Sequence, residues 1–338
     1  MTALRDPHDG SLSSLSWTGA WRPQQLLDSR AHLVHLDRHT VRLLARDLPE
    51  HVNPTTDPTA LDALRAVLGP LLSEVAGAVM DRLGPAGPGL AVVDGDGLDA
   101  LSDGRLGSLA FGLSILLGRP IAQNRERDVV VTVLDERPGD IERARGYRTN
   151  GRMLMHTDPT DVAGLLCLGQ GAEGGAGVYA SAGAVLDDLT DAAPELVHRY
   201  FQPWRWNLRG TQRPGADPIV RSPVFGVSRG VLSCRYGSLL IREGSRGLLE
   251  CDAQAGAALD LFEEVAQRPH LSLRWSLCRG QSVWLNNHRV LHGREAFEDN
   301  DSTGRVRRLL RTWIWSHGPS SLPSTFLPFC DAIDAGAE

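Results

Sequence analysis

The feature that most constrains the fold is a series of short, β-rich runs between residues 150 and 316, which Gly and Pro separate from one another. Many short strands with frequent turns are typical of a sandwich, a barrel or a jelly roll. The runs that we expect to be strands are 151–157, 162–168, 176–181, 218–227, 231–236, 271–277, 282–286 and 307–315. One helix, at 254–267, is expected among them.

The first third of the chain has a helical character instead. Apolar residues recur at helical spacing from Leu61 to Leu83. Gly69-Pro70 interrupts this run, which predicts two consecutive helices with Pro70 near the start of the second. A strand at 90–93, a helix at 97–117 and a β-rich run at 129–134 are expected next. Helices in the first third and strands after them predict an α+β fold, with helices packed on one face of the sheet.

The charge balance and the ends of the chain limit the classes of partner. The net charge is −6, so no basic surplus favours nucleic acid or an anionic membrane. We expect no stretch long and apolar enough to span a bilayer. The N-terminus is polar and lacks a signal-peptide pattern, and the five cysteines form no C-x-x-C pair. These features predict a cytoplasmic protein.

A short motif on the first of the predicted strands carries the chemistry. Residues i and i+2 of a strand share a face, so His156 and Asp158 place an imidazole beside a carboxylate. By itself an H-x-D pair is a weak indication, since most such pairs are surface accidents. The run from His288 to Arg294 adds a distant histidine, and the strand at 307–315 adds arginines. Two histidines and one carboxylate can occupy one face of an iron(II) ion and leave three positions open.

With these residues the sequence resembles the taurine dioxygenase (TauD/TfdA) family, the clavaminate synthase-like branch of the Fe(II)/2-oxoglutarate oxygenases. The resemblance covers about residues 115–316. The runs that carry it are Leu-Gly-Arg-Pro-Ile-Ala-Gln (117–123), His-Thr-Asp (156–158), Asp-Val-Ala-Gly-Leu-Leu-Cys-Leu (161–168), Gly-Gly (174–175), Leu-Ser-Cys-Arg-Tyr (232–236) and Asn-Asn-His-Arg-Val-Leu-His-Gly-Arg (286–294). It implies a double-stranded β-helix (jelly-roll, cupin-like) core.

The resemblance also implies an activity and its cofactors. Such enzymes use Fe(II), 2-oxoglutarate and O₂ to hydroxylate, desaturate or cyclise at an unactivated C–H bond, and they release succinate and CO₂. His156, Asp158 and His292 would bind the iron, with His288 as the competitor for the third position. By the same resemblance Arg311 would hold the distal carboxylate of 2-oxoglutarate, with Arg307 as its competitor, because relatives carry two arginines four residues apart here and the second is usually the carboxylate partner. Arginine suits this role, since it binds carboxylates in bidentate fashion, and all 35 positively charged side chains are arginines.

The sequence departs from the family pattern after the Gly-Gly pair and keeps it at Asp158. Many relatives place a Thr or Ser after the Gly-Gly pair to contact 2-oxoglutarate, but Ala176 and Gly177 stand here. That contact is lost or comes from another residue, such as Ser181. Halogenating relatives replace the ligand carboxylate with a small residue, so Asp158 favours hydroxylation.

Several polar residues are candidates for contacts with the substrate. Arg152 lies four residues before His156 and would share its face, where it would suit a carboxylate, phosphate or sulfonate. A solvated surface arginine is an equally good interpretation. Gln123, Arg235 and Arg209 are further candidates. We expect a small polar metabolite of specialised metabolism, anionic or amino-acid-like, either free or tethered to a carrier, and a homo-oligomer is an open alternative to a monomer.

Two other functions compete with this one. A zinc hydrolase could use His288 and His292, four residues apart, although no glutamate stands between them to act as general base. A non-catalytic β-barrel binding protein is the other alternative. For domain organisation, we expect a flexible arm at 1–20 and a single domain at 21–330. Its helical part would cover about 21–118 and its core about 119–316, with a lid-like insertion at 202–222.

Overall fold

Two β-sheets form the centre of the protein in the computed structural model, which describes residues 17–124, 126–136, 146–209, 211–213, 215–249, 252–316 and 322–333. Their strands are β1 (Leu33–Leu36), β2 (Leu90–Gly95), β3 (Arg119–Pro120), β4 (Val130–Val133), β5 (Met153–His156), β6 (Val162–Gly169), β8 (Gly177–Ser181), β13 (Leu273–Trp275), β14 (Ser282–Asn286), β15 (Val290–Arg294) and β17 (Arg308–Trp315). The larger sheet has the order β1-β2-β14-β6-β17-β3, with β4 also paired to β17, and the smaller has the order β13-β8-β15-β5.

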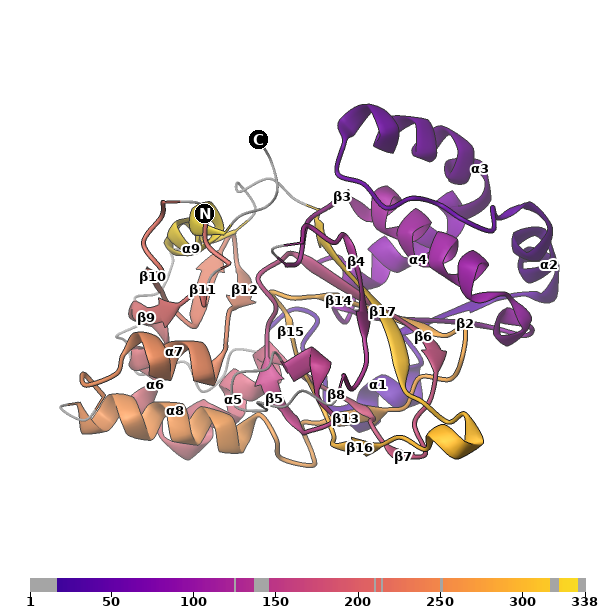
Figure 1. Ribbon diagram of the computed structural model, residues 1–338. Coiled ribbons are helices and arrows are strands. Elements are labelled where there is room, and N and C mark those ends of the chain that lie inside the picture. Colours follow the sequence, from indigo (N-terminus) through magenta and orange to yellow (C-terminus); the bar gives the residue numbers. More distant parts are fainter. Residues whose placement is uncertain are drawn as a thin grey trace.

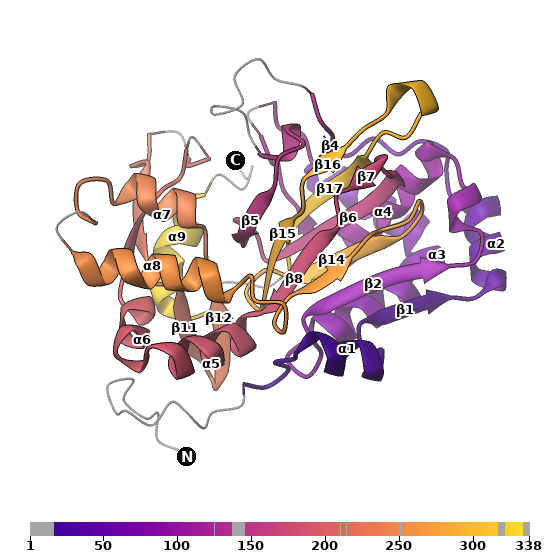
Figure 2. The same ribbon diagram turned by 90° about the horizontal axis from the view of Figure 1, so that it is seen from below.

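Helices cover the sheets on two sides. They are α1 (Pro23–Ser29), α2 (Arg38–Asp47), α3 (Pro58–Leu83), α4 (Asp103–Leu117), α5 (Ala182–Ala192), α6 (Pro194–Phe201), α7 (Ser238–Gly244), α8 (Ala253–Val265) and α9 (Leu327–Ala332). Helices α2–α4 lie on the right of Figure 1 and α5–α9 on the left, and Figure 2 shows the same division. The expected mixture of helices and sheets is confirmed, but the first third supplies only part of the helices.

The described residues of the segment 202–222 form more regular structure than its Gly, Pro and Arg content predicts. Within it, β9 (Trp204–Asn207) and β10 (Ile219–Ser222) form an antiparallel pair. Trp204 and Trp206 alternate into the core, and the Trp206 indole N–H donates to the Ser222 carbonyl at 2.8 Å. Burial of the two indoles outweighs the turn-forming residues around them. Two further pairs are β11 (Phe225–Ser228) with β12 (Val231–Cys234), and β7 (Glu173–Gly174) with β16 (Phe297–Glu298).

Helix α3 corrects the prediction of two helices, because it runs unbroken through Pro70. Proline removes one hydrogen bond from a helix and crowds the carbonyl four residues earlier. Here both Pro70 and Ala66 are exposed, so water can bind the freed carbonyl. On the opposite side Leu68 and Leu72 are fully buried and hold the helix together across the proline.

We expect Pro70→Ala to raise the free energy of unfolding. The gain should be about 1–3 kcal/mol, since proline inside a helix costs about 3 kcal/mol relative to alanine and its restriction of the unfolded chain offsets part of this. Urea denaturation followed by circular dichroism measures it. Pro58→Ala is the matched control, because Pro58 occupies the first turn of α3, where proline is favourable. An equal gain in both variants would contradict the argument.

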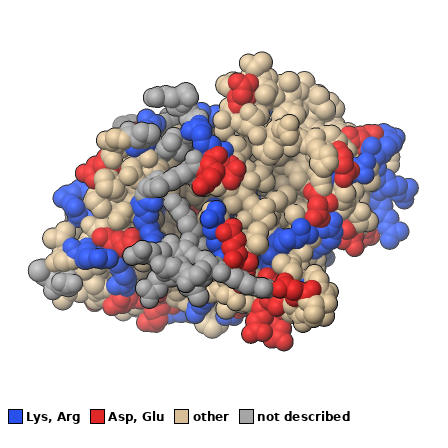
Figure 3. All heavy atoms as spheres, viewed as in Figure 1, with Lys and Arg blue, Asp and Glu red and all other residues tan. Residues whose placement is uncertain are grey.

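By length and composition alone α3 could cross a bilayer, contrary to the expectation from sequence. Its most apolar window is one-third buried, and Leu61, Leu68 and Val79 pack in the core with α4. The outer side includes Val67, which is 61% exposed. The surface at the upper right of Figure 3, over α3, accordingly shows few charged side chains. A core helix of a soluble protein passes the same length and composition test, so this feature is weak support for a membrane span.

The predicted domain limits stay predictions. Most of the expected arm lies outside the described residues. Its end is held in place, because Arg289 Nη2 donates to the Thr18 carbonyl at 2.9 Å.

Candidate active site

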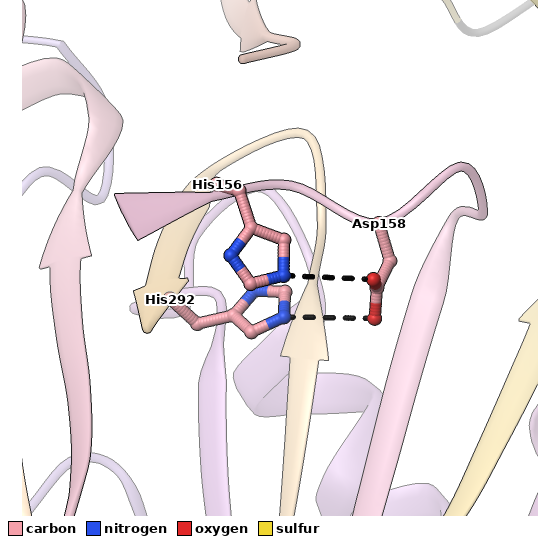
Figure 4. Close-up of side chains that lie close together, drawn as sticks. All are labelled: His156, Asp158 and His292. Carbon is pink, nitrogen blue, oxygen red and sulfur yellow. Dashed lines mark ion pairs between the residues drawn. The ribbon is translucent and has the colours of Figure 1, made fainter. Parts of the chain in front are cut away.

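Three polar side chains converge where β5 and β15 lie side by side. His156 ends β5, Asp158 follows it, and His292 lies opposite His156 in the register of the small sheet. The Nε2 atoms of His156 and His292 lie 3.7 and 3.5 Å from the two carboxylate oxygens of Asp158 (Figure 4). One potential ligand atom from each residue lies within 4.8 Å of the others, which makes this the cluster predicted from the H-x-D motif and the distant histidine.

Hydrogen bonds hold His156 and Asp158 in the forms that bind a metal. His156 Nδ1 lies 2.8 Å from the Leu154 carbonyl, which can only accept, so this nitrogen carries the proton and Nε2 keeps its lone pair. Asp158 Oδ2 accepts from the Trp313 indole N–H at 2.9 Å. Partners of this kind orient metal ligands in proteins.

The electrostatic surroundings of Asp158 and His292 also favour the protonation states that bind a metal. Burial would raise the pKa of Asp158, but the neighbouring side chains of His156 and His292 and the charge of Arg311 hold that pKa well below its ordinary value. Burial, together with the neighbouring His156, lowers the pKa of His292. The carboxylate is therefore ionised and the imidazole neutral at neutral pH. Two imidazole nitrogens and one carboxylate on one side of a cavity fit an iron(II) ion with open positions.

Trp313→Phe is expected to weaken binding of Fe(II) about 10–100-fold, the usual effect of losing a group that orients a ligand. Phenylalanine keeps an aromatic ring but removes the N–H that Asp158 accepts. Anaerobic titration of Fe(II) against a competing chelator measures the affinity. Trp315→Phe, two residues further along β17, is the control, because Trp315 stacks with Arg119 instead. Unchanged affinity in the Trp313 variant would remove this orienting role.

A cavity of about 220 Å³ opens above the three side chains. Its walls come from β4, β6 and β17 of the large sheet and from β5, β8, β13 and β15 of the small sheet. Arg311 and Arg307 both line it, as expected for two arginines four residues apart, and Arg294 and Arg305 line it too. Arg294, Arg307 and Arg311 are each at most 8% exposed.

The two predicted cofactor arginines lie in different surroundings. Arg311 Nε donates to Gln123 Oε1 at 2.7 Å, and its guanidinium carbon lies 4.8 Å from the Tyr147 ring and 4.5 Å from the Trp313 ring. Its charge acts on both Asp158 and His292. Arg307 Nε donates to the Gly175 carbonyl at 3.3 Å, and its guanidinium carbon lies 5.1 Å from the Phe297 ring.

None of the four predicted substrate residues lines this cavity. Gln123 lies behind Arg311 and holds it. Arg235 is buried elsewhere, with its guanidinium carbon 4.2 Å from the Phe329 ring. Arg209 pairs with Glu243 at 3.3 Å and is exposed. No described residue of the candidate lid at 202–222 reaches the cavity either.

Arg152 does not share the face of β5 that His156 presents to the cavity, and a β-bulge is the reason. The register between β15 and β5 pairs His292 with His156 but Arg294 with Met153, so β5 carries one extra residue. Such a bulge reverses the face that the residues before it present. Met153 consequently lines the cavity, while Arg152 is exposed and hydrogen-bonds to Gln267.

His288, the competing ligand, belongs to another cluster. Its Nε2 lies 2.9 Å from Asp161 Oδ1, and both groups are buried. The described residues that could hold a metal do not include it. This arrangement removes the pair of histidines that the zinc-hydrolase interpretation requires.

Sequence reasoning missed three residues of the site, namely Trp313, Tyr179 and Arg294. Trp313 could have been found, since it lies two residues after Arg311 and shares its face of the strand. The other two depend on the register between β8 and β15, which the sequence does not reveal.

Comparisons with known proteins agree with this geometry. The chain is 35% identical over 236 residues to FR-33289 synthase from Streptomyces rubellomurinus (strain ATCC 31215), covering 68% of this chain and 69% of that protein. It is 25% identical over 235 residues to a uridine-5'-phosphate dioxygenase from Amycolatopsis sp, covering 64% and 81%.

Among solved structures, asparagine oxygenase in complex with Fe(II), 2S,3S-3-hydroxyasparagine and succinate has the same fold. The TM-score is 0.66 at 18% identity, with 84% of this chain and 94% of that chain covered. Residues 67–313 match the family described as "Taurine catabolism dioxygenase TauD, TfdA family". Because this match spans most of the sequence, the chain belongs to the TauD/TfdA family of Fe(II)- and 2-oxoglutarate-dependent dioxygenases.

Proposed function

We propose that this enzyme hydroxylates an unactivated C–H bond of a small, anionic or amino-acid-like metabolite in specialised metabolism. The observation that carries the proposal is the convergence of His156, Asp158 and His292 within 4.8 Å at the floor of an arginine-lined cavity. Iron and 2-oxoglutarate, when bound, supply the oxidising chemistry. Asp158 occupies the position that is a small residue in halogenating relatives, which favours hydroxylation.

The protein's own residues hold the metal and orient its ligands. His156, Asp158 and His292 hold the metal, while Trp313 and the Leu154 carbonyl fix the directions of two of these ligands. Strands of both sheets form the walls of the cavity. We further propose that these sheets are the halves of a double-stranded β-helix, which the likeness to asparagine oxygenase supports.

Arg307 and Arg311 suit two different anions. A five-carbon dicarboxylate that chelates a metal through one end places its other carboxylate several bonds away from the metal ligands. Arg307 fits that position, because its charge acts on Tyr179 and Cys167, whereas the charge of Arg311 acts on Asp158 and His292 beside the metal position. We therefore assign the distal carboxylate to Arg307 instead of Arg311, and an anionic group of the substrate to Arg311.

The names of the relatives support this substrate class. Uridine-5'-phosphate carries a phosphate, and asparagine is an amino acid with a carboxylate. A buried guanidinium beside the metal would bind either anion in bidentate fashion. A free or carrier-tethered substrate, a homo-oligomeric state and a cytoplasmic location stay predictions.

Anaerobic addition of Fe(II) and 2-oxoglutarate to the metal-free protein tests the proposal. We expect a weak visible charge-transfer band that requires both additions. Consumption of 2-oxoglutarate under oxygen should then rise with phosphate-bearing compounds or amino acids, and less with their uncharged analogues. Tight binding of zinc without any band would contradict the proposal, and binding of neither metal would favour a non-catalytic protein.

A further inference from the structure

The end of the cavity formed around Arg307 contains a second buried arginine. Arg294, on β15, is 5% exposed, and its guanidinium carbon lies 4.8 Å from the same Phe297 ring that Arg307 contacts. Arg294 Nη2 donates to the carbonyls of Thr149 and Gly151. Within the described ranges, neither guanidinium forms an ion pair with a carboxylate.

Both guanidiniums have donors that no described residue satisfies. Nε and Nη1 of Arg294 and Nη1 of Arg307 are buried without a hydrogen bond to any described residue. Both guanidiniums are buried, and both lie against the Phe297 ring, so two positive charges are close together here. Two like charges with unsatisfied donors are costly in a protein interior unless an anion joins them. This end of the cavity is therefore suited to an anion.

Tyr179 brings a hydroxyl to the same place. It lies opposite His292 in the register of β8 and β15, so its ring starts on the side of the metal ligands. Its ring then extends over Gly177, where an added Cβ would lie only 2.2 Å from the Tyr179 oxygen. Gly177 pairs with Arg294, so the phenol points from the metal ligands toward the two arginines.

Gly175 and Gly177 explain why no Thr or Ser follows the Gly-Gly pair, as it does in many relatives. At Gly175, whose φ is +77°, an added Cβ would lie 2.9 Å from Arg307 Cδ and Nε. Gly175 thus leaves room for Arg307, and Gly177 leaves room for Tyr179. A hydroxyl cannot come from Ala176, but the phenol of Tyr179, three residues later, lines the cavity.

We propose that Tyr179 and Arg294 complete, together with Arg307, the binding site for the distal carboxylate of 2-oxoglutarate. Tyr179 Oη supplies the hydrogen bond that the Thr or Ser of relatives would give, and Arg294 adds a second guanidinium. This assignment rests on the proposed function, and in particular on Arg307 as the primary partner of that carboxylate.

Binding measurements test the proposal without turnover. Anaerobic titrations of the Fe(II) protein give dissociation constants for 2-oxoglutarate and for 2-oxovalerate, which has a methyl group in place of the distal carboxylate. We expect Tyr179→Phe to weaken 2-oxoglutarate binding about tenfold or more, as for a lost hydrogen bond to a charged group. Binding of 2-oxovalerate should be unchanged. Arg294→Gln should likewise reduce the preference of the protein for 2-oxoglutarate over 2-oxovalerate.

Tyr147→Phe is the matched control, because Tyr147 also lines the cavity but lies against Arg311. Its affinity for 2-oxoglutarate should equal that of the wild type. Gly177→Ala should reproduce the effect of Tyr179→Phe, because a Cβ there displaces the phenol. Unchanged 2-oxoglutarate affinity in Tyr179→Phe, or equal losses for both ligands, would overturn this proposal alone. A wild-type protein that gives no band with either ligand would overturn the proposed function itself.

Discussion

Asp158→Ala should abolish the charge-transfer band that Fe(II) and 2-oxoglutarate produce in the wild-type protein, and turnover with it. Asp158 supplies the only carboxylate in the cluster, and both histidines are oriented toward it. Removing a ligand should cost more than the roughly 10–100-fold loss that follows from removing an orienting group behind a ligand. The band is recorded anaerobically over a range of Fe(II) concentrations.

Two control variants sharpen this result. Asp96→Ala removes an exposed carboxylate that pairs with Arg38, and it should leave the band intact. His288→Gln removes the histidine that pairs with Asp161 and should also retain the band, although it destabilises the fold by leaving a buried carboxylate with one partner fewer. A band that survives Asp158→Ala but disappears with His288→Gln would mean that the metal binds elsewhere.

Trp284→Ala should produce the largest loss of stability among the substitutions considered. The indole lies in the middle of β14, between Ala91 of β2 and Gly164 of β6, and is 1% exposed. It packs into the core formed with α3 and α4. Truncation of a buried Trp to Ala costs about 3–5 kcal/mol, because it removes apolar contacts and leaves a cavity. That is a large part of the roughly 5–15 kcal/mol that stabilises a typical domain.

Urea denaturation of the metal-free protein measures this loss. Val67→Ala, on the exposed side of α3, is the control and should change the free energy of unfolding by no more than about 0.5 kcal/mol. The indole of Trp284 is tightly packed, since a Cβ added at Gly164 would lie 2.4 Å from its ring. A loss below about 1 kcal/mol for Trp284→Ala would mean that neighbouring side chains refill the cavity.

Of the metal ligands, His292 followed from the resemblance to the family, since no strand was predicted around it. His156 and Asp158 could be predicted from local geometry, because they share a strand face by the two-residue repeat. The predicted strands likewise fall on β5, β6, β8, β14 and β17, because turn residues bound each of them. These features depend only on neighbours in the sequence.

The residues that were misassigned depend on contacts between distant segments. The extra residue in β5 turns Arg152 away from the cavity, and a bulge leaves no mark in the sequence. Arg235 packs on Phe329 from the end of the chain, 94 positions later. The continuity of α3 depends on which side of the helix faces solvent at Pro70. Tertiary packing decided each of these outcomes.

The division of the cavity walls between two sheets gives the cosubstrate a mechanical role. The proposed metal ligands belong to β5, β15 and the turn after β5, on the side of the small sheet, whereas Arg307 directly precedes β17 of the large sheet. A 2-oxoglutarate molecule bound to the metal at one end and to Arg307 at the other would link the two sheets. Its dissociation would then be coupled to separation of the sheets. Loosening the packing between the sheets should shorten the residence time of 2-oxoglutarate, even when every group that recognises it is intact.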